Sequence, residues 1–519
     1  MVKPKRVDVL VVGSGAAGSL IAAKLAKAGK QVAVLEAGPK RAMSDLVSSQ
    51  IWARRLKWAG PTVETGGQDA LSVGFGTGWG TGGAAMHHYA CWFRLHADDF
   101  QMKTRFNKGQ DWPLAYDDLR PYYDRVQAEV GISGDASKEV WRPDGEPYPM
   151  PPLPQFAQGR LIAKGFEKLG LRTSPLPMAI NSVPYKGRPA CIFDGWCDAG
   201  CPTGALANPL ALHLKEALEA KAELLHDRRV TRVLTNAAGD QATGVEYVTS
   251  AGIRGEIMAS VVVLAANAFE IPRILLNSRD GGLANSSDTV GRYMMAHTTA
   301  SVFGLFEEPT DNHLGMTGGH LLSQDSYKKD PAKGYVASSQ WLIGNALKPN
   351  DLLGIANTRA DLFGEPLHEF MRTAAHHLAI MTFVGEGLPI AENRLVLSDN
   401  KDSYGMPLAK VVHTFHDDSI RCWEAGVKEG KAVFEAAGAH TTWVSGRNRM
   451  HTLGGAIMGD SAKHSVTNSY GQAHDVDNLF VAGSSLFPTS GAVNPTFTLT
   501  ALALRSADHI LSSWPQFPD

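Results

Sequence analysis

Three cysteines share one eleven-residue stretch of the chain: Cys191, Cys197 and Cys201. Thiolates are the usual ligands of iron-sulfur clusters, and the glycines between them would let a short loop wrap around an inorganic core. A proline follows Cys201, as in the Cys-Pro ending of bacterial cluster loops. Three nearby thiolates match a three-iron cluster. The same residues also permit a zinc site, which normally needs four ligands, or a disulfide with one cysteine left over.

A second chemical motif lies near the N-terminus, where Gly13, Gly15 and Gly18 follow the apolar stretch 7–12 and precede a helix-like stretch. Gly13 suits a tight turn, Gly15 lets the backbone approach a pyrophosphate at the helix N-terminus, and Gly18 permits close helix–strand packing. The next apolar stretch ends at Glu36, an acid placed to bind a ribose hydroxyl and to repel a 2′-phosphate. This order predicts a dinucleotide site, although the motif alone does not choose between FAD and NAD.

Several further elements must return to the N-terminal sheet to position these groups. The expected strands are 223–234, 244–248, 260–265 and 477–483, and the expected helices are 269–277 and 499–511. The Gly-rich segment 74–83 suits a backbone that comes close to a ligand, although it is equally well interpreted as a flexible loop. The Pro-rich stretch 147–154 disfavours helix and central strand, so we place a domain transition near it.

Composition excludes several kinds of partner. Fifty basic residues against 52 acidic ones leave a formal charge of -2, so no broad basic field would attract nucleic acid or anionic lipid. The apolar runs are shorter than a bilayer crossing needs, so we expect no direct membrane span. A chain of 519 residues with 44% hydrophobic residues can bury a large core and favours more than one structural unit.

The order of these motifs resembles that of the glucose-methanol-choline (GMC) oxidoreductase family over nearly the whole chain. The matching segments are the glycine motif with Glu36, Gly82-Gly83, Asp111-Trp-Pro, Ala265-Ala266-Asn267, His451 and Gly491-Ala-Val-Asn-Pro-Thr. The resemblance implies an α/β protein with a Rossmann-like FAD-binding domain and a discontinuous α+β substrate-binding domain. The first would comprise 1–110, 188–298 and 452–519, with a cluster loop at 188–205, and the second 111–187 and 299–451.

The resemblance also implies the residues that bind FAD and act on the substrate. His451 would be the general base, since a neutral imidazole can accept a hydroxyl proton at neutral pH. The Asn494 amide would hold the hydroxyl oxygen while the adjacent carbon gives a hydride to the flavin. The implied FAD-binding residues are Gly13, Gly15, Gly18, Glu36, Gly82, Gly83, His87, Val230, Ala266, Gly483, Asn494, Pro495 and Thr496.

Within that family, His87, the stretch 147–154 and the Cys-x5-Cys-x3-Cys loop resemble the catalytic subunits of bacterial membrane-associated FAD-dependent sugar and polyol dehydrogenases. This implies that Cys191, Cys197 and Cys201 hold a three-iron, four-sulfur (3Fe-4S) cluster, which would pass electrons singly to a cytochrome c or another redox partner. It also implies a small chaperone-like subunit. A chain without its own leader would be exported to the periplasm with that partner, and a cytoplasmic location fits the sequence equally well.

The expected activity is therefore dehydrogenation of a hydroxyl on a sugar, glycoside or polyol. Met450 stands where some glucose-oxidising relatives carry an amide, so a glycoside, ketose or polyol fits as well as glucose. One alternative is an oxygen-using flavin oxidase without a cluster. A second is a redox-silent flavoprotein that serves as a lyase or scaffold. A third, an NAD-dependent reductase, leaves the cysteine loop and Asn494 without a role.

Overall fold

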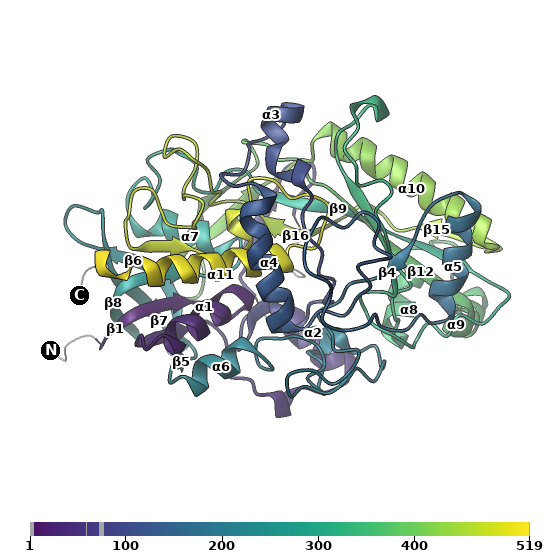
Figure 1. The fold of residues 1–519 in the computed structure, drawn as a ribbon, viewed down its shortest axis with the longest axis horizontal. Helices are drawn as coiled ribbons and strands as arrows, with labels where there is room; N and C mark the ends of the chain where they lie inside the picture. The colour runs from purple at the N-terminus through teal and green to yellow at the C-terminus, as the bar shows by residue number, and fades with distance from the viewer. Residues whose placement is uncertain (1–4, 59, 72–76, 518–519) are drawn as a thin grey trace.

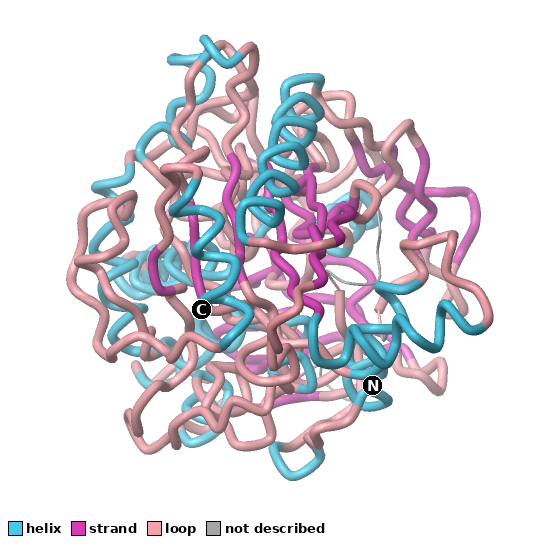
Figure 2. The backbone as a smooth tube through the Cα atoms, turned by 90° about the vertical axis from the view of Figure 1, so that its right-hand side faces the viewer, coloured by secondary structure: helices cyan, strands magenta, loops and turns pink. Residues whose placement is uncertain are grey.

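Two large sheets, one in each half of the molecule, organise the chain (Figure 1). The computed structural model describes residues 5–58, 60–71 and 77–517. Residues 72–76, which include the start of the Gly-rich segment 74–83, lie outside the described residues. Figure 2 shows a group of strands in the interior, with helices and many long loops around them, and further strands at the right-hand edge of the view.

The first sheet has the strand order β5-β2-β1-β8-β7-β6, with β17 beside β8. Its strands are β1 Lys5–Val12, β2 Val32–Leu35, β5 Glu223–Leu225, β6 Arg229–Thr235, β7 Ala242–Val248, β8 Arg254–Leu264 and β17 Leu479–Val481. β1 pairs in parallel with β2 and β8, and β17 pairs in parallel with β8. Parallel strands are covered on both faces and need continuous apolar runs. Residues 9–11 and 261–264 form such runs and are fully buried.

Helices cover this sheet and bring the two chain ends together. α1 Ala16–Lys27 packs against α6 His213–Glu219 and α11 Thr496–Ser512, and α11 also packs against α4 Tyr116–Val130 (Figure 1). α7 Glu270–Ser278 packs against β6. The N-terminal helix and the C-terminal helix are therefore neighbours, which places the glycine motif beside the segment that precedes α11.

The second sheet is antiparallel, with the order β15-β9-β12-β11-β10-β4 and β16 beside β9. Its strands are β4 Ser174–Pro175, β9 Met295–Leu305, β10 Leu321–Ser323, β11 Ser339–Ile343, β12 Leu378–Gly385, β15 Thr441–Val444 and β16 Asn448–Leu453. Alternate side chains of a strand point to opposite faces. Val302 accordingly joins the core under α5 Ala157–Lys168 and α10 Asp417–Ala437, whereas Phe303 joins the core under α8 Pro349–Ala356 and α9 Glu365–His377.

The remaining strands form a three-stranded sheet, and two further helices complete the chain. They are β3 Val63–Gly66, β13 Arg394–Lys401, β14 Pro407–Val412, α2 Gln50–Trp58 and α3 Met102–Phe106. The Pro-rich stretch 147–154 contains only an isolated bridge at Met150, as predicted. Within the described ranges, no helix has the length and hydropathy needed to span a bilayer.

The expected strand–turn–helix at the N-terminus and the C-terminal strand and helix are confirmed. The expected strand 260–265 is longer than predicted, because β8 begins at Arg254. Its first residues carry polar, partly exposed side chains and pair in antiparallel fashion with β7. An apolar run therefore marks only the half of β8 that lies between parallel neighbours.

Candidate active site

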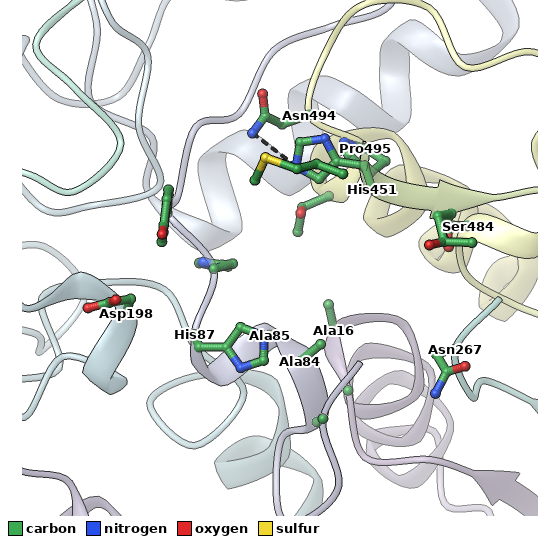
Figure 3. A pocket seen from close by; sticks show the side chains of 18 of the residues that line it. Ala16, Ala84, Ala85, His87, Asp198, Asn267, His451, Ser484, Asn494 and Pro495 are labelled. Atoms are coloured by element: carbon green, nitrogen blue, oxygen red, sulfur yellow. Dashed lines mark hydrogen bonds between the residues drawn. The ribbon is translucent and has the colours of Figure 1, made fainter. Parts of the chain in front are cut away.

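A cavity of about 600 Å³ is walled by elements from both large sheets, and most of the predicted site residues line it (Figure 3). The predicted residues on its wall are Gly13, Gly15, Glu36, Gly83, His87, Val230, Ala266, His451, Gly483, Asn494, Pro495 and Thr496. Gly18 and Gly82 do not line it, but both support the turn that does. Gly18 packs on the backbone of Gly13, and the Gly82 N–H donates to Ser14 Oγ at 2.9 Å. The folded chain thus gathers the predicted residues around one space.

The glycine motif is shaped to admit a pyrophosphate. Gly13 has φ +105°, and a Cβ there would lie 2.6 Å from the Ala265 carbonyl oxygen. A Cβ on Gly18 would lie 2.1 Å from the Gly13 carbonyl oxygen. A Cβ on Gly15, by contrast, would meet nothing closer than the Gly82 carbonyl oxygen at 3.9 Å, so open space lies beside this turn. α1 starts here without a side-chain cap, which leaves backbone N–H groups for an anion. These features fit the diphosphate of FAD.

Glu36 lies at the end of β2, where it both lines the cavity and braces the turn. Its carboxylate accepts hydrogen bonds from Ser14 Oγ at 2.6 Å, from the Gly38 N–H at 3.0 Å and from the Gly80 N–H at 2.9 Å. The side chain is 4% exposed. These bonds fix the carboxylate against the glycine motif, and its contact with a ribose hydroxyl stays a prediction.

His451 and Asn494 meet on the opposite wall, across from Ala16, Ala84 and Ala85 (Figure 3). Asn494 Nδ2 lies 3.5 Å from His451 Nε2. His451 has φ +59° within β16, at a register shift in the pairing of β16 with β9. A bulge in a strand changes the direction of a side chain, and strained backbone conformations of this kind are common at functional sites. The pair predicted to perform the chemistry, 43 residues apart in the sequence, is therefore brought together at the cavity.

The electrostatic surroundings keep the His451 imidazole neutral. Burial lowers the pKa of His451 well below its ordinary value, and the nearby His297 lowers it further. A neutral imidazole has one nitrogen with a free lone pair and can accept a proton. The site can thus remove a hydroxyl proton, and the Asn494 amide can hold the oxygen.

Acid should destabilise the folded chain through its buried histidines. Burial lowers the pKa of four of them to about 4: His213, His297, His320 and His413. In the unfolded chain they titrate near 6.5, so the unfolded state binds more protons as the pH falls below that value. The stabilisation is complete above pH 6.5 and is lost between about 6.5 and 4. We expect the free energy of unfolding to fall by several kcal/mol from pH 7.5 to pH 5.

Denaturant titrations followed by near-ultraviolet circular dichroism at these two pH values measure this loss. His413→Gln removes one of the four buried imidazoles, so the free energy of unfolding should fall by about a quarter less between these two pH values. A free energy of unfolding that stays constant over this range would contradict the buried, neutral state of these imidazoles.

The cysteine loop runs from the cavity wall to the surface. Cys197 is buried in the short 3₁₀ turn Cys197–Ala199, and the next residue, Asp198, lines the cavity. At the other end Ile192, which follows Cys191, is 61% exposed. Cys191 and Cys201 are half-buried, and their sulfurs accept backbone N–H groups from Phe193 and Leu206, each at 3.4 Å.

All five cysteines are free thiols, so the loop contains no disulfide. Burial, with a smaller contribution from the charges of the neighbouring cysteines, raises the pKa of Cys197 to about 12 and that of Cys191 to about 11. Over the residues that the structure describes, no three His, Cys, Asp or Glu side chains are arranged as a metal-ligand group. The N–H donors at two of the sulfurs are the contacts that favour thiolates.

Sequence reasoning missed two side chains that contact the predicted pair. His297 Nδ1 lies 2.9 Å from His451 Nδ1, and Gln340 Nε2 lies 3.5 Å from Asn494 Oδ1. Both lie in buried strands, β9 and β11. Nothing in the local sequence distinguishes His297 among the 18 histidines of the chain, and only the pairing of β16 with β9 reveals it.

Comparisons with known proteins find matches over nearly the whole chain. A family model described as GMC oxidoreductase matches residues 7–299, and a second with the same description matches residues 389–503. The fructose dehydrogenase large subunit of Gluconobacter japonicus is 30% identical, over 98% of this chain and 98% of the relative. The 2-methyl-1,2-propanediol dehydrogenase of Mycolicibacterium austroafricanum is 33% identical, over 97% of this chain and 95% of the relative. The paromamine 6′-oxidase of Streptomyces fradiae is 27% identical, over 96% and 90%.

Two solved structures share the fold. Formate oxidase from Aspergillus oryzae has a TM-score of 0.70 at 16% identity and covers 99% of this chain and 100% of its own. Pyridoxine 4-oxidase from Mesorbium loti has a TM-score of 0.67 at 17% identity and covers 97% and 99%. The predicted α/β fold class is thereby confirmed.

Proposed function

The chain belongs to the GMC oxidoreductase family, and from this premise we propose that it is an FAD-dependent dehydrogenase of a hydroxyl on a sugar, glycoside or polyol. The observation that carries this proposal is the contact between His451 and Asn494 on the wall opposite an open glycine turn. A base and an amide donor face the space in which a dinucleotide fits. That arrangement suits removal of a proton and a hydride from one CH–OH group.

The chain's own side chains perform the proton chemistry. His451 Nε2 accepts the hydroxyl proton, and Asn494 Nδ2 donates to the oxygen as negative charge develops on it. His451 is half-buried on the cavity wall. Bound FAD supplies the hydride acceptor for the carbon.

The lining of the cavity supports a substrate with several hydroxyl groups. The wall of the cavity also includes the polar side chains of Asn345 and Thr382 and the apolar ones of Phe303 and Leu342. Thr382 Oγ1 donates to Asn345 Oδ1 at 3.1 Å, which fixes a polar pair on the wall. Relatives named for fructose, for a branched diol and for gluconate support the same substrate class.

On this proposal Cys191, Cys197 and Cys201 hold a 3Fe-4S cluster, which supplies a one-electron outlet between the flavin and an external acceptor such as a cytochrome c. Two observations support it: the loop extends from the cavity wall at Asp198 to the surface at Ile192, and backbone N–H groups donate to two of the sulfurs. The relative named as a large subunit supports a small partner subunit. Export to the periplasm with that subunit completes the proposal.

An oxygen-using oxidase is the second candidate. Relatives named as oxidases match the chain over nearly its whole length, and no metal-ligand arrangement occurs among the described side chains. In that case the three cysteines are structural, and turnover in air yields hydrogen peroxide.

One experiment separates the candidates. Absorption and electron paramagnetic resonance spectra of purified protein are recorded without oxygen, before and after addition of fructose, gluconate, methyl glycosides and 1,2-diols. We expect flavin bands and a three-iron signal that both fade with one substrate class. Flavin that bleaches in iron-free protein, with peroxide formed in air, would establish the oxidase. Flavin that no alcohol bleaches would overturn both activities.

A further inference from the structure

The two ring nitrogens of the buried His297 have partners of different kinds. Its Nε2 lies 2.9 Å from the Gly491 carbonyl oxygen and 3.4 Å from that of Ser490. A carbonyl oxygen can only accept, so Nε2 carries the hydrogen. Burial lowers the pKa of His297 to about 4, so at neutral pH the ring carries one hydrogen only. Its Nδ1 is therefore an acceptor.

The lone pair on His297 Nδ1 determines which nitrogen of His451 carries the hydrogen. His297 Nδ1 lies 2.9 Å from His451 Nδ1, and two acceptors at that distance would repel each other. His451 must consequently donate from Nδ1, and its single hydrogen is then used. The lone pair remains on Nε2, the nitrogen that lies 3.5 Å from Asn494 Nδ2 at the cavity.

The side chains of Gln324 and Gln340 fix the orientation of the Asn494 amide independently. Gln324 Nε2 donates to Gln340 Oε1 at 2.9 Å, so Gln340 presents its Nε2 to Asn494 Oδ1 at 3.5 Å. Asn494 is left with its Nδ2 toward His451. The orientation of the Asn494 amide, deduced from Gln324, and the tautomer of His451, deduced from the Gly491 carbonyl, therefore agree: the Asn494 N–H faces the lone pair on His451 Nε2.

The carbonyl at the far end is held firmly by its neighbours. Thr489 Oγ1 donates to the Asp99 carbonyl at 2.8 Å, and the Ala492 N–H donates to Tyr327 Oη at 3.1 Å. Tyr327 Oη donates in turn to Asp99 Oδ2 at 2.8 Å, and Lys329 pairs with Asp99 at 3.0 Å. Asp99 is also the charged group that acts on His297. Because the Gly491 carbonyl is held in place, it keeps the hydrogen of His297 on Nε2.

We propose that His297 is a positioning residue that holds His451 as the Nδ1–H tautomer and so presents the Nε2 lone pair to the substrate hydroxyl. The role of His451 as base rests on the proposed function, whereas the tautomer does not. A histidine base with its hydrogen on the wrong nitrogen cannot accept the proton, and in a protease triad that error costs about 10⁴-fold in rate.

The test combines a spectroscopic readout with kinetics. Long-range ¹H–¹⁵N spectra of the flavin-loaded protein, labelled with ¹⁵N-histidine, report which nitrogen of each ring is protonated, and loss of peaks in His451→Gln assigns His451. We expect Nδ1–H in the native protein. In His297→Leu the single tautomer should be lost and kcat should fall on the order of 10²-fold, with KM changed less than about 3-fold. His297→Asn keeps an acceptor oxygen near the Nδ1 position and should recover most of kcat.

The matched control is His213→Leu, which removes another buried neutral histidine, one that does not line the cavity. It should leave the His451 peaks and kcat unchanged. A native His451 protonated on Nε2 would overturn the proposal without any variant. So would an unchanged tautomer and kcat in a folded His297→Leu protein. If the tautomer depends on His297 as stated but no alcohol bleaches the flavin, the proposed function fails and the positioning role stands.

Discussion

Replacement of His451 by glutamine is expected to slow bleaching of the bound flavin by substrate about 10² to 10⁴-fold, the range for loss of a general base. Glutamine retains a polar side chain of similar reach, so the cavity should keep its shape and the KM should change little. Its amide cannot accept a proton at neutral pH. Stopped-flow absorption under anaerobic conditions measures the rate directly, and His213→Gln serves as the control for loss of a buried imidazole.

The pH dependence of the native enzyme gives an independent check on the same residue. A base acts only in its unprotonated form, and burial lowers the pKa of His451 well below 6.5. The bleaching rate should therefore hold its plateau as the pH falls from 8 to 6, instead of declining as an exposed imidazole would make it decline. A rate that halves near pH 6.5, or a His451→Gln protein as fast as the native one, would exclude His451 as the base.

The parts of the site that the sequence predicted are those built by contiguous residues. The turn from Gly13 to Gly18 is a local backbone conformation, and Gly13 and Gly18 are required by contacts within the strand–turn–helix itself and with Ala265. The Asn494-Pro495 segment is likewise local, since it directly precedes α11, with Pro495 at the N-cap. The residues that form these segments are contiguous, so their motifs can be read directly from the sequence, and the bounds of both segments were predicted to within a few residues.

The contacts that orient the proposed catalytic pair, His451 and Asn494, could not be predicted from the local sequence. His297 reaches His451 across 154 residues of sequence, and Gln340 reaches Asn494 across the same number. Each lies in a strand of the second sheet that is buried nearly throughout, so buried and exposed side chains do not alternate along it. Which polar residue of a buried strand faces the active site depends on register, and register is set by strand pairing. The fold had to be known before either residue could be chosen.

The cysteine loop stands between these two cases. Its spacing is local and was recognised, whereas its position between the cavity wall and the surface follows only from the packing of the whole chain. In the proposed function this stretch of eleven residues, which lines the cavity at Asp198 and is exposed at Ile192, holds the cluster that passes electrons outward. The strongest test of this role measures two rates separately: reduction of the flavin by substrate, and transfer of electrons from the flavin to an external acceptor.

Cys197→Ser is expected to leave bleaching of the flavin by substrate within about 3-fold of the native rate, because no cysteine of the loop lines the cavity. Turnover with cytochrome c as acceptor should fall by more than about 10 to 100-fold, the cost of disturbing even the outer partners of a metal ligand. Iron content and the three-iron resonance signal should fall with it. The control is Cys422→Ser, the same substitution at a buried thiol in α10 outside the loop, where iron and turnover should be unchanged. A Cys197→Ser protein that retains its iron and its turnover with cytochrome c would remove the cluster from the function, because a relay that has lost a ligand cannot keep its rate.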